Sequence, residues 1–184
     1  MSEGRPWYRE PETFIALAAL VVSVSAVAVG MYEAALQRRH DRAEVWPHLE
    51  FTTFTTPNGA SLSVENTGIG PALIKSVVIT VDGKRAHHWD EVLTSLLGHA
   101  PPAPFSHSTI AESALRPGDK VMVLGVPNGD MPPDFWTTVH RVAIEVCYSS
   151  VFDEYWTMRD AGVGGRTRWE PASGCPAQAE GDDF

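Results

Sequence analysis

Hydrophobic and polar positions follow different periods in the two parts of the chain. From Phe14 to Met31 no side chain is charged and most are apolar. A helix of this length covers about 27 Å at about 1.5 Å per residue, which is just enough to span a bilayer core. From Leu49 onward the pattern changes to period two, which is typical of strands with one buried face. The sequence therefore predicts a transmembrane helix over residues 13–32 and a mainly β domain over residues 48–161.

The flanks of the apolar segment favour an anchor that is retained. Trp7 and Tyr8 precede the segment and Tyr32 follows it, where aromatic side chains are expected at a membrane interface. The alternative is a cleavable signal peptide, because Ala26-Val27-Ala28 fits the small-x-small cleavage pattern. The N-terminal flank over residues 1–12 mixes acidic with basic side chains, which is atypical of signal peptides. We therefore expect a single-pass protein of the bacterial inner membrane.

Small residues recur along one face of the predicted helix, at steps of three or four positions. Small side chains let the backbones of two membrane helices approach closely. The face is therefore either a packing surface for another helix or the ordinary composition of a weakly apolar span. Its members are Ala16, Ala19, Ser23, Ala26 and Gly30.

A polar segment over residues 33–47 links the helix to the β domain. We expect a helical stalk that ends at Trp46-Pro47, because proline disfavours helical backbone in the residue before it. Basic side chains are balanced across the span: two arginines and the terminal amine precede it, and three arginines follow it. Charge alone therefore leaves open which side of the membrane holds the β domain.

The β domain begins with a predicted hairpin from Leu49 to Val64, whose turn is Pro57-Asn58-Gly59. A long strand is expected from Leu73 to Val81, and a short helix from Asp90 to Leu97 with Asp90 as its cap and Gly98 after it. Further strands are expected over 106–110, 120–126, 139–149 and 155–159. About seven antiparallel strands suggest a β-sandwich. Residues 162–184 are rich in glycine, proline and acids, which predicts a flexible acidic tail with no core.

Two local patterns resemble a known class of domain. The first is Val64-Glu65-Asn66-Thr67-Gly68-Ile69-Gly70-Pro71-Ala72 leading to Val81-Asp82-Gly83, and the second is Leu115-Arg116-Pro117-Gly118-Asp119 leading to Val121. They resemble bacterial immunoglobulin-like domains of the cell-adhesion-related type over residues 48–126. The resemblance implies an immunoglobulin-like β-sandwich on the outer side of the membrane, with a turn at each pattern. The layout of anchor, stalk and Asn-x-Gly also looks like uncharacterised bacterial single-pass membrane proteins.

The charge balance excludes one class of partner. The chain has 14 Lys and Arg against 23 Asp and Glu, for a net charge of −9, and the excess lies almost wholly after Pro47. Such a domain repels phosphate backbones, so no nucleic acid partner is expected. No phosphate-binding loop, dinucleotide fingerprint, zinc-protease pair or nucleophile elbow occurs. We therefore expect no cofactor, no catalytic residue and no enzyme.

Several histidines and acids are candidates for a chemical site. His87, His88, Asp90, His99 and His107 carry ligand atoms suited to a metal. Their spacing matches no ligand motif, and adjacent strand residues point to opposite faces, so we expect solvated histidines and no metal. Asp153 and Glu154 fit either a hairpin turn or acid/base chemistry, and a turn is expected.

Cysteines and tryptophans leave alternatives open. Cys147 and Cys175 form one bridge, if the compartment is oxidising, or none. Trp89, Trp136, Trp156 and Trp169 fit either a core or an aromatic surface, and Trp169 is the best surface candidate.

The resulting hypothesis is a membrane-anchored, non-enzymatic protein-interaction module, an accessory or assembly subunit of a membrane complex. Its partners are the lipid bilayer and either a membrane protein or a second copy of the chain. A ligand-binding sensor domain that signals through its helix is the alternative, and it requires a pocket. A metal-dependent hydrolase is the third possibility, resting on the histidine cluster.

Overall fold

The computed structural model describes residues 11–56, 59–101, 105–127, 138–162 and 166–184. It divides the chain into two compact units, Met1–Ala43 and Glu44–Phe184. The first unit is helical in its described part and the second is mainly β, as the change of period predicts. Trp7 and Tyr8 lie outside the described residues.

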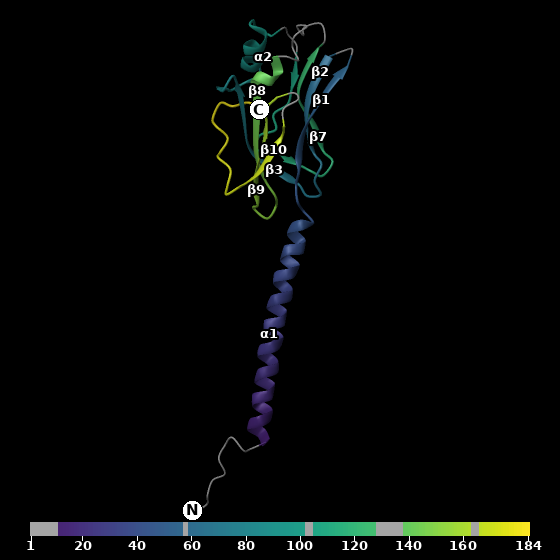
Figure 1. Cartoon of the computed structure of the whole chain (residues 1–184), viewed down its shortest axis with the longest axis vertical. Coiled ribbons are helices and arrows are strands. Elements are labelled where there is room, and N and C mark those ends of the chain that lie inside the picture. The colour runs from purple at the N-terminus through teal and green to yellow at the C-terminus, as the bar shows by residue number, and fades with distance from the viewer. Residues whose placement is uncertain (1–10, 57–58, 102–104, 128–137, 163–165) are drawn as a thin grey trace, which may run out of the picture. The chain divides into compact units, whose positions relative to one another are not determined.

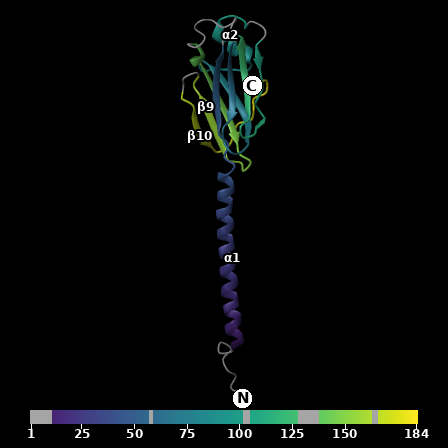
Figure 2. The same ribbon diagram turned by 90° about the vertical axis from the view of Figure 1, so that its right-hand side faces the viewer.

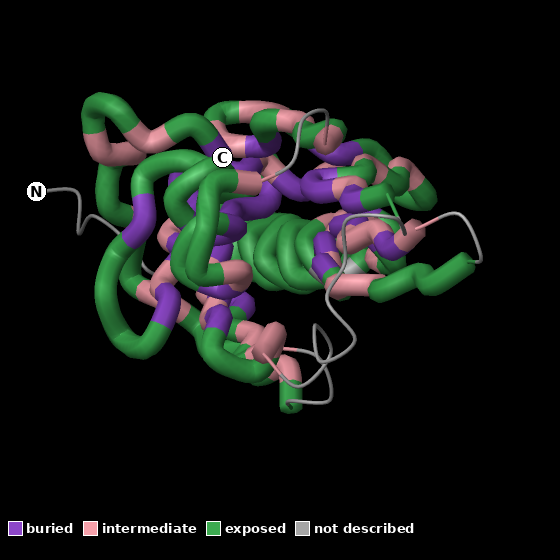
Figure 3. Tube along the Cα trace, turned by 90° about the horizontal axis from the view of Figure 1, so that it is seen from above, coloured by how far each residue is buried: buried purple, intermediate pink, exposed green. Residues whose placement is uncertain are grey.

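The first unit is the helix α1, Pro11–Ala43. It covers the predicted span and most of the predicted stalk in one uninterrupted element, so the stalk stops being helical at Ala43 rather than at Trp46. Among the described residues, α1 alone is long and apolar enough to cross a membrane. Its residues are almost all exposed (Figure 3), and a signal sequence has the same length and composition as such a span.

The second unit contains two antiparallel sheets (Figures 1 and 2). The first sheet has the order β1-β2-β7-β5, and the second has the order β10-β9-β8-β3-β4, with β6 also paired to β3. The bounds of the first sheet's strands are β1 Leu49–Thr56, β2 Gly59–Asn66, β7 Lys120–Pro127 and β5 Ser106–His107. Those of the second are β10 Arg168–Ala172, β9 Tyr155–Asp160, β8 Val142–Ser149, β3 Ala72–Val81, β4 Lys84–Ala86 and β6 Ala114–Leu115.

Both sheets contribute alternate residues to one core, as period-two strands require. Leu49 and Val64 bury their side chains from the first sheet, and Val77, Ile79 and Val146 do so from the second. The predictions of a mainly β domain with antiparallel sheets and of one apolar helix are therefore confirmed.

A short helix, α2 (Trp89–Leu97), lies at one end of the sheets (Figures 1 and 2). Gly98 ends it in the left-handed conformation, as its position after the helix predicted. The prediction of Asp90 as the N-terminal cap is wrong, because the helix begins one residue earlier and His88 occupies the cap position. Glu91 in the first turn accepts a hydrogen bond from the backbone N–H of His87 at 2.8 Å, which ties the residue before the cap to the helix.

Other boundaries differ from the sequence prediction in detail. The strand expected over 106–110 is only two residues long, and that over 139–149 begins with a single 3-10 turn, η3 (Val139–Arg141), before β8. Three short strands, β4, β6 and β10, were not expected. Short edge elements have little periodicity of their own, which is why sequence patterns miss them.

The expectation of a tail without a core is wrong for the described part of residues 162–184. Strand β10 extends the second sheet by pairing with β9, and Phe184 is only 1% exposed. Gln178 accepts a hydrogen bond from the backbone N–H of Val77 at 2.8 Å. The Asp182 carboxylate bonds to Arg85 and His87. Burial raises the pKa of Asp182, but these hydrogen bonds outweigh it, so the pKa lies below its usual value.

Candidate functional site

The small-residue face predicted on the helix lies on α1, and all five of its residues are exposed. Ser23 donates its hydroxyl to the carbonyl oxygen of Ala19 at 2.7 Å, so its polar group is satisfied within the helix. A Cβ atom added at Gly30 would meet no atom within 4 Å. Tyr32 is exposed on the same helix. The face is therefore open to a partner, and the described residues do not show what packs on it.

A disulfide joins Cys147 and Cys175, with an S–S distance of 2.05 Å. Cys147 lies in the middle of β8, and Cys175 follows β10, so the bond fastens the C-terminal segment to the second sheet. The sequence left this pairing open. A bond that closes a loop of this length typically stabilises a domain by about 2–4 kcal/mol.

The histidines and acids do not converge on one site. Among the described residues, no group of three or more His, Cys, Asp and Glu side chains is placed to hold a metal ion. His87 instead bonds to Asp182 at 2.6 Å, and His99 faces the carbonyl oxygen of Ala100 at 2.8 Å. Asp153 lies between β8 and β9 with a left-handed φ of 56°, which is a turn conformation.

The four tryptophans that fit either a core or an aromatic surface have different surroundings. Trp89 is buried in the core, and Trp156 stacks half-buried on Tyr148 with ring centroids 5.9 Å apart. Trp136 lies outside the described residues. Trp169 is partly exposed, and its ring lies tilted against that of His48 with centroids 4.6 Å apart. It donates its indole N–H to the carbonyl oxygen of Leu49 at 2.8 Å.

Strand β1 forms an open edge of the first sheet. Among the described strands it pairs only with β2. The Trp169 indole covers the carbonyl oxygen of Leu49 at the start of β1, and no described strand covers the outer side of the residues that follow. The six residues from Phe51 to Thr56 contain no charged side chain and no proline, and four of them are threonines. Threonine and phenylalanine favour strands. Proteins usually protect such an edge with lysine, proline or a bulge. Neither lysine nor proline occurs among these six residues.

The outward face beside this edge is partly apolar. Phe54 on β1 is 59% exposed, and Met122 on β7 is also exposed. Lys120 lies 5.8 Å from the centre of the Phe54 ring and 3.4 Å from Glu65. Small side chains of β2 lie between Phe54 and Met122 in the ladder. Two exposed apolar side chains therefore lie on the same sheet as the open edge.

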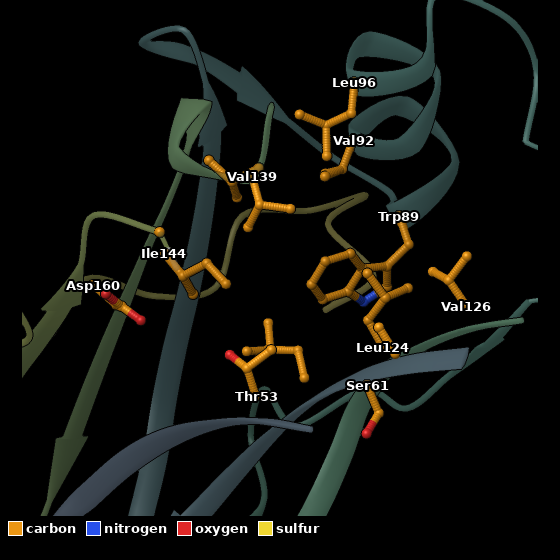
Figure 4. Close-up of a pocket in the computed structure, with 14 residues that line it drawn as sticks. Thr53, Ser61, Trp89, Val92, Leu96, Leu124, Val126, Val139, Ile144 and Asp160 are labelled. Atoms are coloured by element: carbon orange, nitrogen blue, oxygen red, sulfur yellow. The ribbon is translucent and has the colours of Figure 1, made fainter. Parts of the chain in front are cut away.

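A cavity of about 70 Å³ lies between the two sheets below α2 (Figure 4). Residues from both sheets and from α2 line it, so elements far apart in the sequence build it together. Its walls are mostly apolar. They include Val92, Leu96, Leu124, Val126, Val142 and Ile144. Thr53 and Ser61 lie toward the surface, since Thr53 is exposed and Ser61 is half-buried.

Two polar groups of this cavity have no hydrogen-bond partner among the described residues. They are the indole Nε1 of Trp89 and the Oδ1 of Asp160. The Trp89 side chain and the Asp160 carboxylate approach the space from different sides in Figure 4. Burial raises the pKa of Asp160, although the backbone N–H groups of Ala161 and Gly162 lower it by hydrogen bonding. Sequence reasoning missed both groups as a site, because they are isolated residues 71 positions apart in a chain without a motif that joins them.

Comparison of the chain with family models, with curated proteins and with solved structures finds no match in any of the three.

Proposed function

We propose that the chain is a single-pass membrane protein whose β domain is a non-enzymatic interaction module of an immunoglobulin-like type, serving as an accessory or assembly subunit. The observation that carries this proposal is the open edge of β1. An extended segment of a partner protein adds to such an edge through backbone hydrogen bonds, and neighbouring side chains supply specificity. The apolar face formed by Phe54 and Met122 lies beside the edge. The exposed small-residue face of α1 offers a second contact, within the membrane.

The disulfide supports a location of the β domain outside the cytoplasm. Structural disulfides persist in oxidising compartments and are rare in the cytosol. Among the described residues no free cysteine is present. The topology that follows has the N-terminus inside, α1 as the anchor and the β domain on the outer side.

Strand addition at β1 predicts a position-specific crosslink. A photoreactive phenylalanine analogue is placed at Phe54 of the full chain in its native membrane, and the same analogue is placed at Phe152 as the matched control. Both side chains are exposed, at 59% and 43%, but Phe152 lies in the turn between β8 and β9 of the second sheet. We expect a discrete crosslinked product at position 54 and none at position 152, detected by gel shift and mass spectrometry.

The mass of the product identifies the occupant, because a product of two identical chains is a homo-oligomer and any other discrete product is a different subunit. Thr52→Lys in the same strand is expected to lower the yield at position 54 several-fold, since lysine on an edge strand opposes pairing. Equal products at positions 54 and 152, or none at 54, would contradict docking at β1.

The outer location predicts how the cysteines label in intact cells. A membrane-impermeant maleimide is expected to modify the chain only after reduction with an impermeant phosphine, because both sulfurs are held in the bond until then. The Cys147→Ser variant leaves Cys175 free and is expected to label without reduction. Labelling of that variant only after lysis would place the domain in the cytoplasm.

A further inference from the structure

We propose that the cavity between the two sheets binds a small uncharged molecule, or the uncharged end of a larger one, that carries both a hydrogen-bond donor and an acceptor on an apolar body. A primary amide or an alcohol is of this class. This site is separate from the strand-docking function proposed above. It rests on the unpaired polar groups of Trp89 and Asp160 and on the apolar walls around them.

The volume limits the size of the ligand. A dry apolar cavity of about 150 Å³ holds one benzene molecule, and the space here is about 70 Å³. A group of a few non-hydrogen atoms therefore fits inside. A longer molecule would extend past Thr53, the exposed lining residue of β1.

The two polar groups define what the ligand must carry. The Trp89 side chain belongs to a residue only 4% exposed, and its indole N–H can only donate. The Asp160 Oδ1 is buried and needs a donor while the carboxylate is ionised. A buried polar group without a partner typically costs about 1–3 kcal/mol of free energy. A ligand that hydrogen-bonds to both groups removes this cost, and the difference adds to its binding free energy.

Charged ligands fit this pair less well. An anion accepts from Trp89 but is repelled by the Asp160 carboxylate and loses its hydration among apolar walls. An ammonium group pairs with Asp160 but offers no acceptor to the Trp89 N–H. An uncharged amide or alcohol has a donor and an acceptor and avoids burying a net charge.

Three probes with the same number of carbon atoms test the proposal: propionamide, propionate and n-propylamine. The full chain in nanodiscs, with ¹⁵N in its tryptophan and glycine residues, is titrated with each probe at neutral pH. The reporters are the Trp89 indole signal, assigned by its loss in Trp89→Phe, and the backbone signal of Gly162, which lines the cavity. Propionamide is expected to shift both reporters saturably and at lower concentration than either ion.

Matched variants separate a specific site from a general effect on the fold. Trp89→Phe keeps an aromatic ring but lacks the donor, and we expect propionamide binding, read at Gly162, to weaken about tenfold, the equivalent of one hydrogen bond of about 1.4 kcal/mol. Trp156→Phe lies outside the lining and is expected to leave binding unchanged. Asp160→Asn has a single acceptor oxygen, which the backbone N–H groups of Ala161 and Gly162 occupy, so it presents an NH2 donor to the cavity and is also expected to weaken propionamide binding.

Two results would overturn the proposal. If n-propylamine or propionate binds more tightly than propionamide, the cavity is an ion site. If no probe shifts the two reporters saturably, the cavity holds water alone. Neither result bears on the crosslink at Phe54, so failure here is distinguishable from failure of strand docking.

Discussion

Replacing Asn66 with alanine is expected to destabilise the β domain by about 3–5 kcal/mol. The Asn66 side chain is completely buried, and both ends of its amide group are satisfied by backbone groups. Oδ1 accepts from two N–H groups and Nδ2 donates to two carbonyl oxygens. These bonds join Asn66 to His48 at 3.2 Å, Gly68 at 3.1 Å, Gly70 at 2.9 Å and Leu115 at 2.9 Å.

The effect is large because alanine would leave several buried backbone groups without a partner, while the cavity it creates adds a packing term. Urea unfolding of the full chain, followed by tryptophan fluorescence, measures the loss. Thr67→Ala is the matched control, since the neighbouring Thr67 hydroxyl makes one exposed hydrogen bond at 3.3 Å. We expect it to cost less than about 0.5 kcal/mol. A loss below 1 kcal/mol for Asn66→Ala would show that water replaces the amide.

The Asn66 network also fastens the first residues of the β domain. The backbone N–H groups of Ile69 and Gly70 both donate to the carbonyl oxygen of Trp46, at 3.0 and 3.2 Å. A Cβ atom at Gly70 would lie 1.8 Å from the carbonyl oxygen of Val45, so only glycine permits this approach. Residues 45–48 are therefore held against the turn that follows β2. This explains why the helical backbone of the predicted stalk ends before Trp46-Pro47.

Local sequence patterns predicted the parts of the fold that depend on local chemistry. The uncharged run from Phe14 to Met31 identifies an apolar helix without any tertiary information. Alternation over residues 77–81 helps to identify β3, since Val77, Ile79 and Val81 are buried and the two residues between them are half-buried. Leu73 was expected on the same face but is only half-buried, because the register shifts between Ile74 and Ser76. Gly98 marks the end of α2 because few other residues adopt its left-handed backbone.

The remaining features depend on contacts between distant residues, which local patterns do not encode. Trp89 and Asp160 share a cavity because α2 and β9 both line it, and no sequence motif joins the two residues. The open edge of β1 follows from the strand order, which a run of threonines does not reveal. The C-terminal segment was misjudged because its composition is typical of a mobile tail. The segment is fastened by the disulfide, by strand β10, by the buried ring of Phe184 and by the polar contacts of Gln178 and Asp182.

Replacing Phe184 with alanine is expected to cost about 3–5 kcal/mol, the usual range for a buried phenylalanine. Its ring packs edge-to-face on Trp89 with centroids 5.4 Å apart, an arrangement that adds to simple burial. Its carbonyl oxygen accepts a hydrogen bond from the backbone N–H of Ala111 at 2.9 Å. Loss of the ring therefore opens a void in the core beside α2.

Urea unfolding of the full chain measures this loss, with Glu180→Ala as the control in the same segment, because the Glu180 side chain is exposed. The control is expected to change stability by less than about 0.5 kcal/mol. Hydrogen exchange adds a local test. The Phe184→Ala variant should exchange faster at the backbone amides of Ala111 and Asp183, whose bonds to Phe184 and His87 fix the segment. Unchanged stability and unchanged exchange at both amides would mean that the C-terminal segment is not anchored by its aromatic residue.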